Sequence, residues 1–176
     1  LHHIALSDPD IVLLVETDLW WHEQLQSLKA RYPHEVSYPN DSGYGMHLFS
    51  RWHLEASELR FLLEDYVPSI RTRVQLPGGR EVLLYCVHPK PPPRTDTTRR
   101  DAELLIVARE ARTQNVPIIV AGDLDDVAWS RTTGLFQEAS GLLDPRIGPG
   151  IYPTFNPTWP LLRWPLDDAF YSDPFL

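Results

Sequence analysis

The sequence has little of several features that define particular classes of protein. It contains one cysteine among 176 residues. Cys86 lies inside the apolar run 82–87, where a core position is expected, so a disulfide framework and a thiolate zinc site are both excluded. No run of about 18 apolar residues is present, so no segment is expected to span a membrane. No signal-peptide pattern follows Leu1, and one cysteine leaves the compartment open.

Positive charge is also scarce. The sequence has 16 Lys and Arg against 24 Asp and Glu, a formal net charge of −8. This balance argues against a general nucleic-acid binder, which usually has a basic face. It does not exclude a nuclease, because a metal ion and a few arginines can hold a phosphate on an acidic protein. Glycine is scarce beside proline, 9 against 17, which favours stiffened loops over a helical bundle.

The remaining composition is that of an ordinary globular protein, with 43% hydrophobic residues. We find no linker and no internal repeat, so we expect a single domain of mixed α/β type over residues 1–176. A helix is expected after Asp18, which is placed as its N-cap. Strands are predicted over 10–17, 44–52, 70–76, 81–87, 117–122 and 166–172, a hairpin turn at 77–80, further helices over 97–114 and 130–139, and loops over 32–43, 89–93 and 141–155.

The most informative segment is Pro117 to Asp126. Its apolar, β-branched part predicts a strand buried on both faces. The strand ends at Gly122 and is followed by three acids, Asp123, Asp125 and Asp126. Carboxylates so close together repel one another unless a cation lies among them. The segment therefore predicts a site for a hard metal ion at the rim of a sheet.

Other predicted strands also end in groups that bind metals or move protons. The first ends at Glu16, another at His88, and the last begins with Asp167 and Asp168. If these strands lie side by side, their polar ends share one rim, with oxygen ligands and a neighbouring imidazole. Such a set suits Mg²⁺ or Mn²⁺ better than zinc or copper. A divalent ion there would neutralise a phosphate oxygen, while a carboxylate orients water and a protonated histidine stabilises phosphoryl charge.

Each of these residues has a simpler interpretation, which stays open at this point. Glu16 and Asp18 could cap a helix, His88 could be a satisfied loop histidine, and Asp123 could be a turn residue. Asp167 and Asp168 could be solvated charges. The tryptophans and the other histidines are interpreted as core, lid, packing or surface residues: Trp129, Trp159, Trp164, His2, His3, His22, His34, His47 and His53.

Together these motifs resemble the endonuclease/exonuclease/phosphatase superfamily, which includes sphingomyelinase-like and inositol-phosphatase-like enzymes. They occur in the family's order and span nearly the whole chain, and the block from Ala121 to Ser130 is the most specific. The matching segments are Val-Glu-Thr-Asp at 15–18, Val-His-Pro at 87–89, Ala-Gly-Asp-Leu-Asp-Asp-Val-Ala-Trp-Ser at 121–130, Thr-Phe at 154–155 and Arg-Trp-Pro-Leu-Asp-Asp at 163–168.

The resemblance implies an α/β (α+β) fold, a four-layer sandwich of two mostly antiparallel sheets flanked by helices. It implies hydrolysis of a phosphoester by water, assisted by Mg²⁺ or Mn²⁺. Glu16 and Asp167 would be metal ligands, His88 would stabilise the phosphate, and Asp123 would position or deprotonate the water. The substrate would be a nucleic acid or a lipid or sugar phosphate. The most similar branch is bacterial and often has membrane helices ahead of this domain, so a tether outside this chain is expected.

Two catalytic positions depart from the family pattern. Asp125 stands where the family usually has Asn, and Asp168 stands where it usually has His in a closing Asp-His pair. An ionised carboxylate cannot donate the hydrogen bonds of those groups and repels a phosphate. The family's first strand and its metal-site Asn are expected before Leu1, so the first strand is taken as missing. We expect tighter cation binding, weaker phosphate binding and reduced activity.

Two alternatives to an active hydrolase follow. The first is a catalytically impaired or inactive family member that acts as a cation- or phosphate-binding module. The second is a sequence-independent nucleic-acid binder that uses the main concentration of basic residues. That concentration comprises Arg71, Arg73, Arg94, Arg99 and Arg100.

Overall fold

The computed structural model describes residues 1–91, 96–126, 129–146 and 166–173. The chain forms two compact units, Leu1–Cys86 and Val87–Leu176. Its strands form a three-stranded sheet of order β1-β3-β2 and a five-stranded sheet of order β4-β5-β6-β7-β8. The elements are α1 (His2–Ser7), β1 (Ile11–Val15), α2 (Leu19–Leu25), a 3-10 helix (Gln26–Ala30), β2 (His34–Tyr38), β3 (Met46–Ser50), β4 (Leu54–Phe61), β5 (Pro68–Gln75), β6 (Glu81–Val87), α3 (Thr98–Arg112), β7 (Ile118–Asp123), α4 (Arg131–Ser140) and β8 (Asp167–Tyr171).

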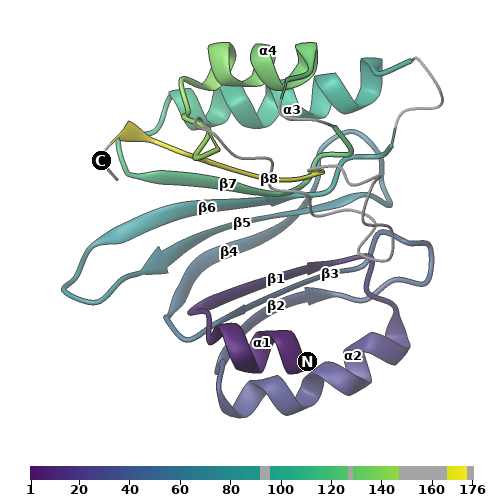
Figure 1. Ribbon diagram of the computed structural model, residues 1–176, viewed down its shortest axis with the longest axis vertical. Helices are drawn as coiled ribbons and strands as arrows, with labels where there is room; N and C mark the ends of the chain where they lie inside the picture. The colour runs from purple at the N-terminus through teal and green to yellow at the C-terminus, as the bar shows by residue number, and fades with distance from the viewer. Residues whose placement is uncertain (92–95, 127–128, 147–165, 174–176) are drawn as a thin grey trace. The chain divides into compact units, whose positions relative to one another are not determined.

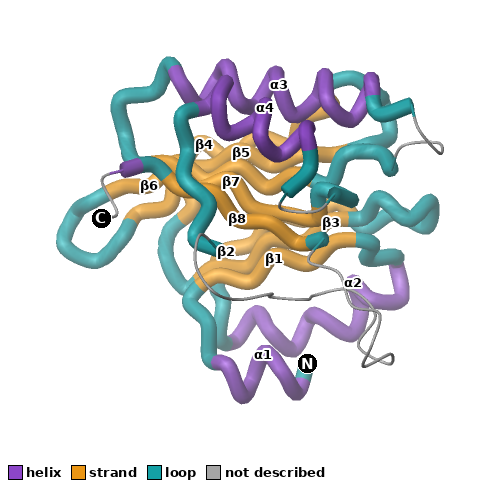
Figure 2. Tube along the Cα trace, turned by 45° about the horizontal axis from the view of Figure 1, so that its top comes forward, coloured by secondary structure: helices purple, strands orange, loops and turns teal. Residues whose placement is uncertain are grey.

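In the first unit, α1 and α2 lie against one face of the β1-β3-β2 sheet (Figure 1; Figure 2). The core on this side contains Val12, Leu25, Tyr32 and Phe49. The predicted N-cap of α2 is confirmed, because the Asp18 carboxylate accepts from the Trp21 N–H at 2.8 Å. The apolar run over 10–17 indicates a buried strand, but Val12 is the one buried residue of β1. β1 is an edge strand, and the central strand β3 is the one buried along its whole length.

The hairpin of β5 and β6 follows the sequence prediction. The two strands pair antiparallel, and the Leu76 N–H donates to the Arg80 carbonyl at 2.7 Å across the turn. Gly78 and Gly79 both have positive φ, which suits glycine in a tight hairpin turn. Cys86 is fully buried, as expected for a core residue. The alternation in 70–76 indicates a half-exposed strand, and this is confirmed, because residues 70, 72 and 74 of β5 are buried and residues 71, 73 and 75 are not.

In the second unit, β7 pairs antiparallel with β8, and α3 and α4 pack together beside them (Figure 1; Figure 2). Burial on both faces of β7 was predicted, but its residues alternate between buried and half-buried. Such alternation is typical of an antiparallel strand, one face of which meets the core. Ser130 caps α4 by accepting from the Thr133 N–H at 3.0 Å. α3 and α4 lie close to their predicted positions.

Two strands were not predicted: β2 and β4. The loop predicted over 32–43 is wrong at β2. The predicted loop segment 147–155, Trp159, Trp164 and the motif residues 163–165 lie outside the described residues. Trp129 is 65% exposed and is not a core residue. No described helix has the length and apolar character needed to cross a membrane. The single domain expected over 1–176 stays a prediction.

Candidate active site at the ends of the strands

Glu16 occupies the turn that follows β1. Its φ is +58°, a left-handed conformation that costs a non-glycine residue energy, and its side chain is exposed. The next residue holds this turn from two sides, because the Thr17 N–H donates to the Gly45 carbonyl and the Thr17 carbonyl accepts from the Asn40 N–H. A Cβ at Gly45 would lie 1.6 Å from the Thr17 oxygen, so only glycine fits there. The chain thus presents the Glu16 carboxylate at the surface of the first unit.

The other five predicted residues belong to the second unit. There β6 runs into His88, and the end of β6 touches the end of β7 at Gly122. A Cβ on Gly122 would lie 1.7 Å from the Val87 carbonyl oxygen, so glycine permits this approach. His88 is 3% exposed, and its Nε2 lies 4.0 Å from an Asp125 carboxylate oxygen. The structure therefore brings His88 to the acidic end of β7, as predicted.

The acidic turn after β7 has a defined geometry. The Asp125 N–H donates to the Asp123 carboxylate at 2.9 Å, so Asp123 does serve as the turn residue of the simpler interpretation. This bond also fixes the direction of the Asp123 side chain. Asp125 has a φ of +49°, which makes it, with Glu16, one of two predicted site residues in a strained backbone conformation. Such strain is common at functional sites.

A buried arginine supports this turn. Arg100 is 4% exposed, donates to the Asp125 carbonyl at 2.8 Å and forms an ion pair with Asp126 at 2.8 Å. It also donates to the Thr132 hydroxyl at 3.0 Å, which joins α3 to α4. The sequence analysis considered Arg100 for nucleic-acid binding, but its guanidinium is buried against the acidic turn. The positive charge of Arg100 offsets much of the repulsion among the carboxylates at 123–126. The sequence of α3 alone does not predict this role.

The adjacent acids of β8 occupy different environments. Asp167 lies opposite Asp123 in the antiparallel ladder and is exposed. Asp168 lies opposite Gly122 and is only 4% exposed. Successive side chains of a strand point to opposite faces, which explains the difference. The interpretation of both as solvated charges is therefore wrong for Asp168.

Asp168 is paired with an arginine that the sequence analysis did not single out. Arg146 contacts the Asp168 carboxylate and also holds Asp144, with N···O distances of 2.9 and 2.7 Å. Burial raises the pKa of Asp168 to about 7; Arg146 opposes this rise, while Asp144 and Asp126 add to it. One guanidinium shared by two carboxylates does not fully compensate the loss of water around Asp168.

The carboxylates present fit a hard divalent cation. Glu16 and Asp167 both expose carboxylate oxygens, the ligand type that Mg²⁺ and Mn²⁺ prefer. Asp123 adds a third oxygen donor opposite Asp167. The carboxylates of each unit thus have the ligand chemistry that Mg²⁺ or Mn²⁺ needs, and a single site that contains all three stays a prediction.

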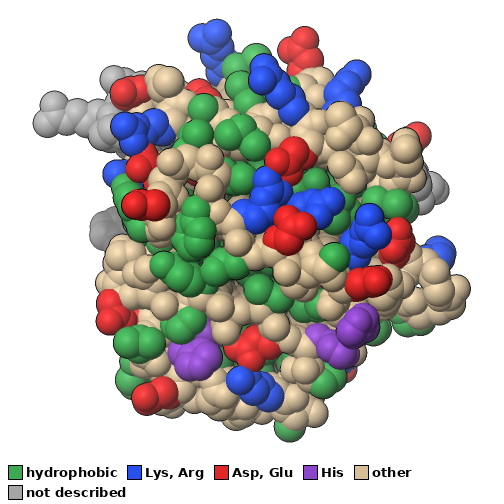
Figure 3. All heavy atoms as spheres, turned by 180° about the vertical axis from the view of Figure 1, so that it is seen from behind, with side chains coloured by type: hydrophobic (Ala, Val, Ile, Leu, Met, Phe, Trp, Pro, Cys, Tyr) green, Lys and Arg blue, Asp and Glu red, His purple; other side chains and the backbone are tan. Residues whose placement is uncertain are grey.

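On the face that Figure 3 displays, the described basic residues do not form a continuous patch. Figure 3 shows Lys and Arg side chains interspersed with Asp and Glu on the face that it displays. Arg71 pairs with Glu58 at 3.2 Å, and Arg100 is buried. Arg94 lies outside the described residues. These observations give no support to the nucleic-acid binder that was considered from the sequence.

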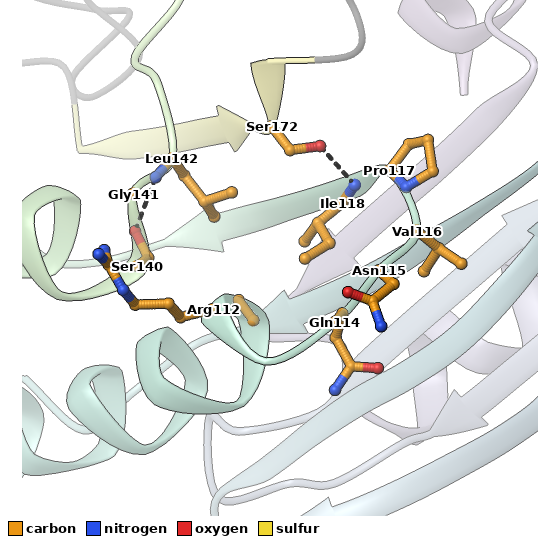
Figure 4. Close-up of a pocket in the computed structure, with 11 residues that line it drawn as sticks. Arg112, Gln114, Asn115, Val116, Pro117, Ile118, Ser140, Gly141, Leu142 and Ser172 are labelled. Carbon is orange, nitrogen blue, oxygen red and sulfur yellow. Dashed lines mark hydrogen bonds between the residues drawn. The ribbon is translucent and has the colours of Figure 1, made fainter.

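A separate pocket of about 410 Å³ lies at the beginning of β7, in the second unit (Figure 4). Arg112, Asn115 and Ser140 contribute to its lining, and the Ser172 hydroxyl accepts from the Ile118 N–H at 2.8 Å beside it. None of its lining residues is a carboxylate or a histidine. Because Asp123 ends β7, this pocket is not the predicted site.

Solved structures share the fold of the chain. It is 22% identical to the human Nocturnin catalytic domain with bound sulfate anion, with a TM-score of 0.75 over 98% of this chain and 72% of that one. It is 18% identical to D. rerio TDP2 complexed with single strand DNA product, with a TM-score of 0.78 over 97% of this chain and 73% of that one. It is 13% identical to beta toxin from Staphylococcus aureus, with a TM-score of 0.71 over 96% of this chain and 74% of that one.

Sequence comparison gives the family. No curated protein matches the chain. The sequence pattern of the Endonuclease/Exonuclease/phosphatase family matches residues 1–176, which is the whole chain. The two sheets and four α-helices of the described residues agree with the fold of the structures above. The chain belongs to the Endonuclease/Exonuclease/phosphatase family.

Proposed function

We propose that this chain is a divalent-cation-dependent hydrolase of phosphoester bonds, in which water attacks phosphorus. The observation that carries the proposal is the arrangement at the end of β7. His88 lies beside Asp125, Asp125 fixes Asp123 through its N–H, and Asp167 lies opposite Asp123. An imidazole, an oriented carboxylate and an exposed carboxylate are the groups that this reaction needs.

Each residue has one role in the proposed reaction. Glu16 and Asp167, the metal ligands that the family resemblance implies, would each offer a carboxylate to Mg²⁺ or Mn²⁺, and the ion would neutralise phosphate charge and stabilise the leaving oxygen. Asp123 accepts a hydrogen bond from the attacking water and takes or directs its proton. His88, when protonated, donates to a phosphoryl oxygen as negative charge grows on it.

Two carboxylates weaken this machinery. Asp125 lies 4.0 Å from the His88 ring, where it competes with a phosphate for the imidazolium. Asp168 is buried in the ion pair with Arg146 and cannot supply the imidazole that the family has at this position. We therefore expect slow hydrolysis. The same two observations favour the alternative of an impaired family member that binds a cation or a phosphate without turnover.

The substrate class follows from the phosphoryl chemistry. One fold neighbour holds a sulfate anion and another a single strand DNA product. Both ligands are anions whose oxygens surround a tetrahedral sulfur or phosphorus atom. The DNA product supports a phosphodiester as the bond that is cleaved, and a lipid or sugar phosphate stays the other substrate class expected from the family resemblance.

The experiment is hydrolysis of bis(p-nitrophenyl) phosphate by the purified chain with Mg²⁺, with Mn²⁺ and with EDTA. We expect turnover with either cation, none with EDTA, and a loss of about 10³-fold in Asp123→Asn. Asp173→Asn is the matched control, since this exposed acid follows β8. Hydrolysis that survives EDTA or Asp123→Asn would contradict the proposal. Calorimetric cation binding without turnover would support the binding module instead.

A further inference from the structure

A second group of potential metal ligands lies in the first unit, away from the residues of the proposed hydrolytic site. His22 comes from α2, Glu35 from β2 and His47 from β3. Ser37 is the register partner of His47, so Glu35, two residues before Ser37, lies on the same face of the sheet as His47. α2 covers this face (Figure 1). One ligand atom from each residue lies within 4.8 Å of the other two.

The two imidazoles face each other directly. His22 Nδ1 lies 2.9 Å from His47 Nε2, and His47 is fully buried. On its other side, His47 Nδ1 bonds to the Thr17 hydroxyl at 2.8 Å. When His47 donates its Nδ1–H to Thr17, its Nε2 lone pair points toward His22. An outer hydrogen bond of this kind orients histidines that bind metals.

Glu35 supplies an independent observation. Its Oε2 forms an ion pair with Lys29 at 2.8 Å. Its Oε1 is buried, and no described residue donates a hydrogen bond to it. A buried carboxylate oxygen without a donor loses its hydration without compensation. A cation beside this oxygen would compensate it.

We propose that His22, Glu35 and His47 bind a divalent transition-metal ion of the zinc type. Two imidazoles and one carboxylate suit such an ion better than Mg²⁺. With metal–nitrogen bonds of about 2.0–2.1 Å, the 2.9 Å separation corresponds to an angle of roughly 90° at the metal. A tetrahedral ion requires the two nitrogens to move apart by about 0.5 Å, which a rotation of the His22 side chain can supply.

Metal binding requires a change of tautomer at His22 but no loss of a proton from the protein. In the metal-free arrangement a single proton lies between His22 Nδ1 and His47 Nε2. When the ion takes both lone pairs, the His22 proton moves to Nε2 of this half-buried ring, where solvent water can accept its hydrogen bond. No proton needs to leave the protein.

The ion would connect three elements. It would tie α2 to β2 and β3 and would stabilise the start of α2, which follows the Glu16 turn. The consequence is stabilisation of the first unit by metal, whether or not the chain hydrolyses phosphoesters. This inference does not depend on the proposed function.

The test uses Co²⁺ and Zn²⁺ on the metal-stripped chain in excess Mg²⁺, which occupies oxygen-only sites. We expect one Co²⁺ with visible absorption bands, displacement by Zn²⁺ and a higher melting temperature with Zn²⁺. His22→Gln and Glu35→Gln should each weaken binding roughly 100-fold. Neither substitution alters the buried His47, so both variants are expected to fold, which circular dichroism checks.

The matched control is His53→Gln. His53 is another histidine of the first unit, in ring contact with His34 at 5.1 Å. It should bind Co²⁺ as the unmodified chain does. Absence of Co²⁺ binding in excess Mg²⁺, or binding by folded His22→Gln and Glu35→Gln at unchanged affinity, would overturn the proposal. Loss of binding in His53→Gln alone would overturn it as well, by placing the ion elsewhere.

Discussion

The acidic end of β7 and β8 and the histidine cluster of the first unit concentrate ligands in different ways. The acidic end takes its donors from residues adjacent in sequence, 123–126 and 167–168, and its donors are oxygens. The histidine cluster takes His22, Glu35 and His47 from three separate elements, and two of its three donors are nitrogens. The comparison teaches that contiguous motifs reveal a hard-cation site, whereas a nitrogen-rich site appears only once the chain is folded.

The two regions also respond to pH in opposite directions. Burial raises the pKa of Asp168 to about 7 and lowers the pKa of His47 to about 4. In both cases burial favours the neutral form. The first unit should therefore lose stability in acid, while the second should lose stability toward alkaline pH.

The largest effect is expected when the two residue types that the family usually has at the acidic end are restored. The double variant Asp125→Asn and Asp168→His removes two negative charges and supplies an amide donor and an imidazole. We expect Mg²⁺-dependent hydrolysis of bis(p-nitrophenyl) phosphate to rise by about 10³-fold, measured as an initial rate. An unchanged rate in the folded double variant would contradict the role given to these positions.

The next effect concerns the arginine that holds the acidic turn. Arg100→Met leaves Asp126 without its buried partner and removes the bond to the Asp125 carbonyl. We expect the free energy of unfolding to fall by about 3 kcal/mol in urea denaturation. Arg99→Met is the control, since it changes a neighbouring arginine of α3 that is exposed. Equal stability of the two variants would show that the buried arginine is dispensable.

A smaller effect tests Asp168 against pH. Its folded pKa lies above its ordinary value of 3.8, so its contribution to stability is fully present below about pH 4 and is lost as the pH rises through about 7. Asp168→Asn should therefore be more stable than the unmodified chain by about 2 kcal/mol at pH 8, with little difference at pH 4. Urea denaturation in EDTA at both pH values measures this. A variant that is less stable at pH 8 would contradict the assignment.

The smallest effect concerns His47, whose folded pKa lies below its ordinary value of 6.5. The contribution of His47 to the free energy of unfolding is fully present above about pH 6.5 and is lost as the pH falls through about 4. Between pH 7 and pH 5 the unmodified chain should lose about 1 kcal/mol that His47→Gln does not lose. Both are measured in EDTA, so that metal binding plays no part. Parallel pH profiles would count against a buried neutral His47.

The sequence predicted the elements that carry strong apolar runs or clear caps. β6, β7, β8 and α3 lie near their predicted positions, and Asp18 caps α2 as expected. It did not predict β2 and β4, which lie at sheet edges and have polar sequences. The ladder of β4 is also irregular between Glu55 and Glu58, which interrupts the alternation on which a strand prediction depends.

For the site, the sequence predicted the residues at the strand ends but not the arginines beside them. His88, Asp123 and Asp125 do come together, because glycine at 122 lets β6 approach β7. The ion pairs of Arg100 and Arg146 were missed because an arginine in a helix or loop has no local pattern that indicates a buried partner. The contact between His22 and His47 was missed because helix and strand periodicity cannot relate positions 25 residues apart.

The most direct test of the central claim adds Asp123→Asn to the Asp125→Asn and Asp168→His double variant. The rate of Mg²⁺-dependent bis(p-nitrophenyl) phosphate hydrolysis is then compared between the two. If the end of β7 carries the reaction, the triple variant loses at least about 10²-fold of the double variant's activity. Equal rates in the double and triple variants would contradict the account.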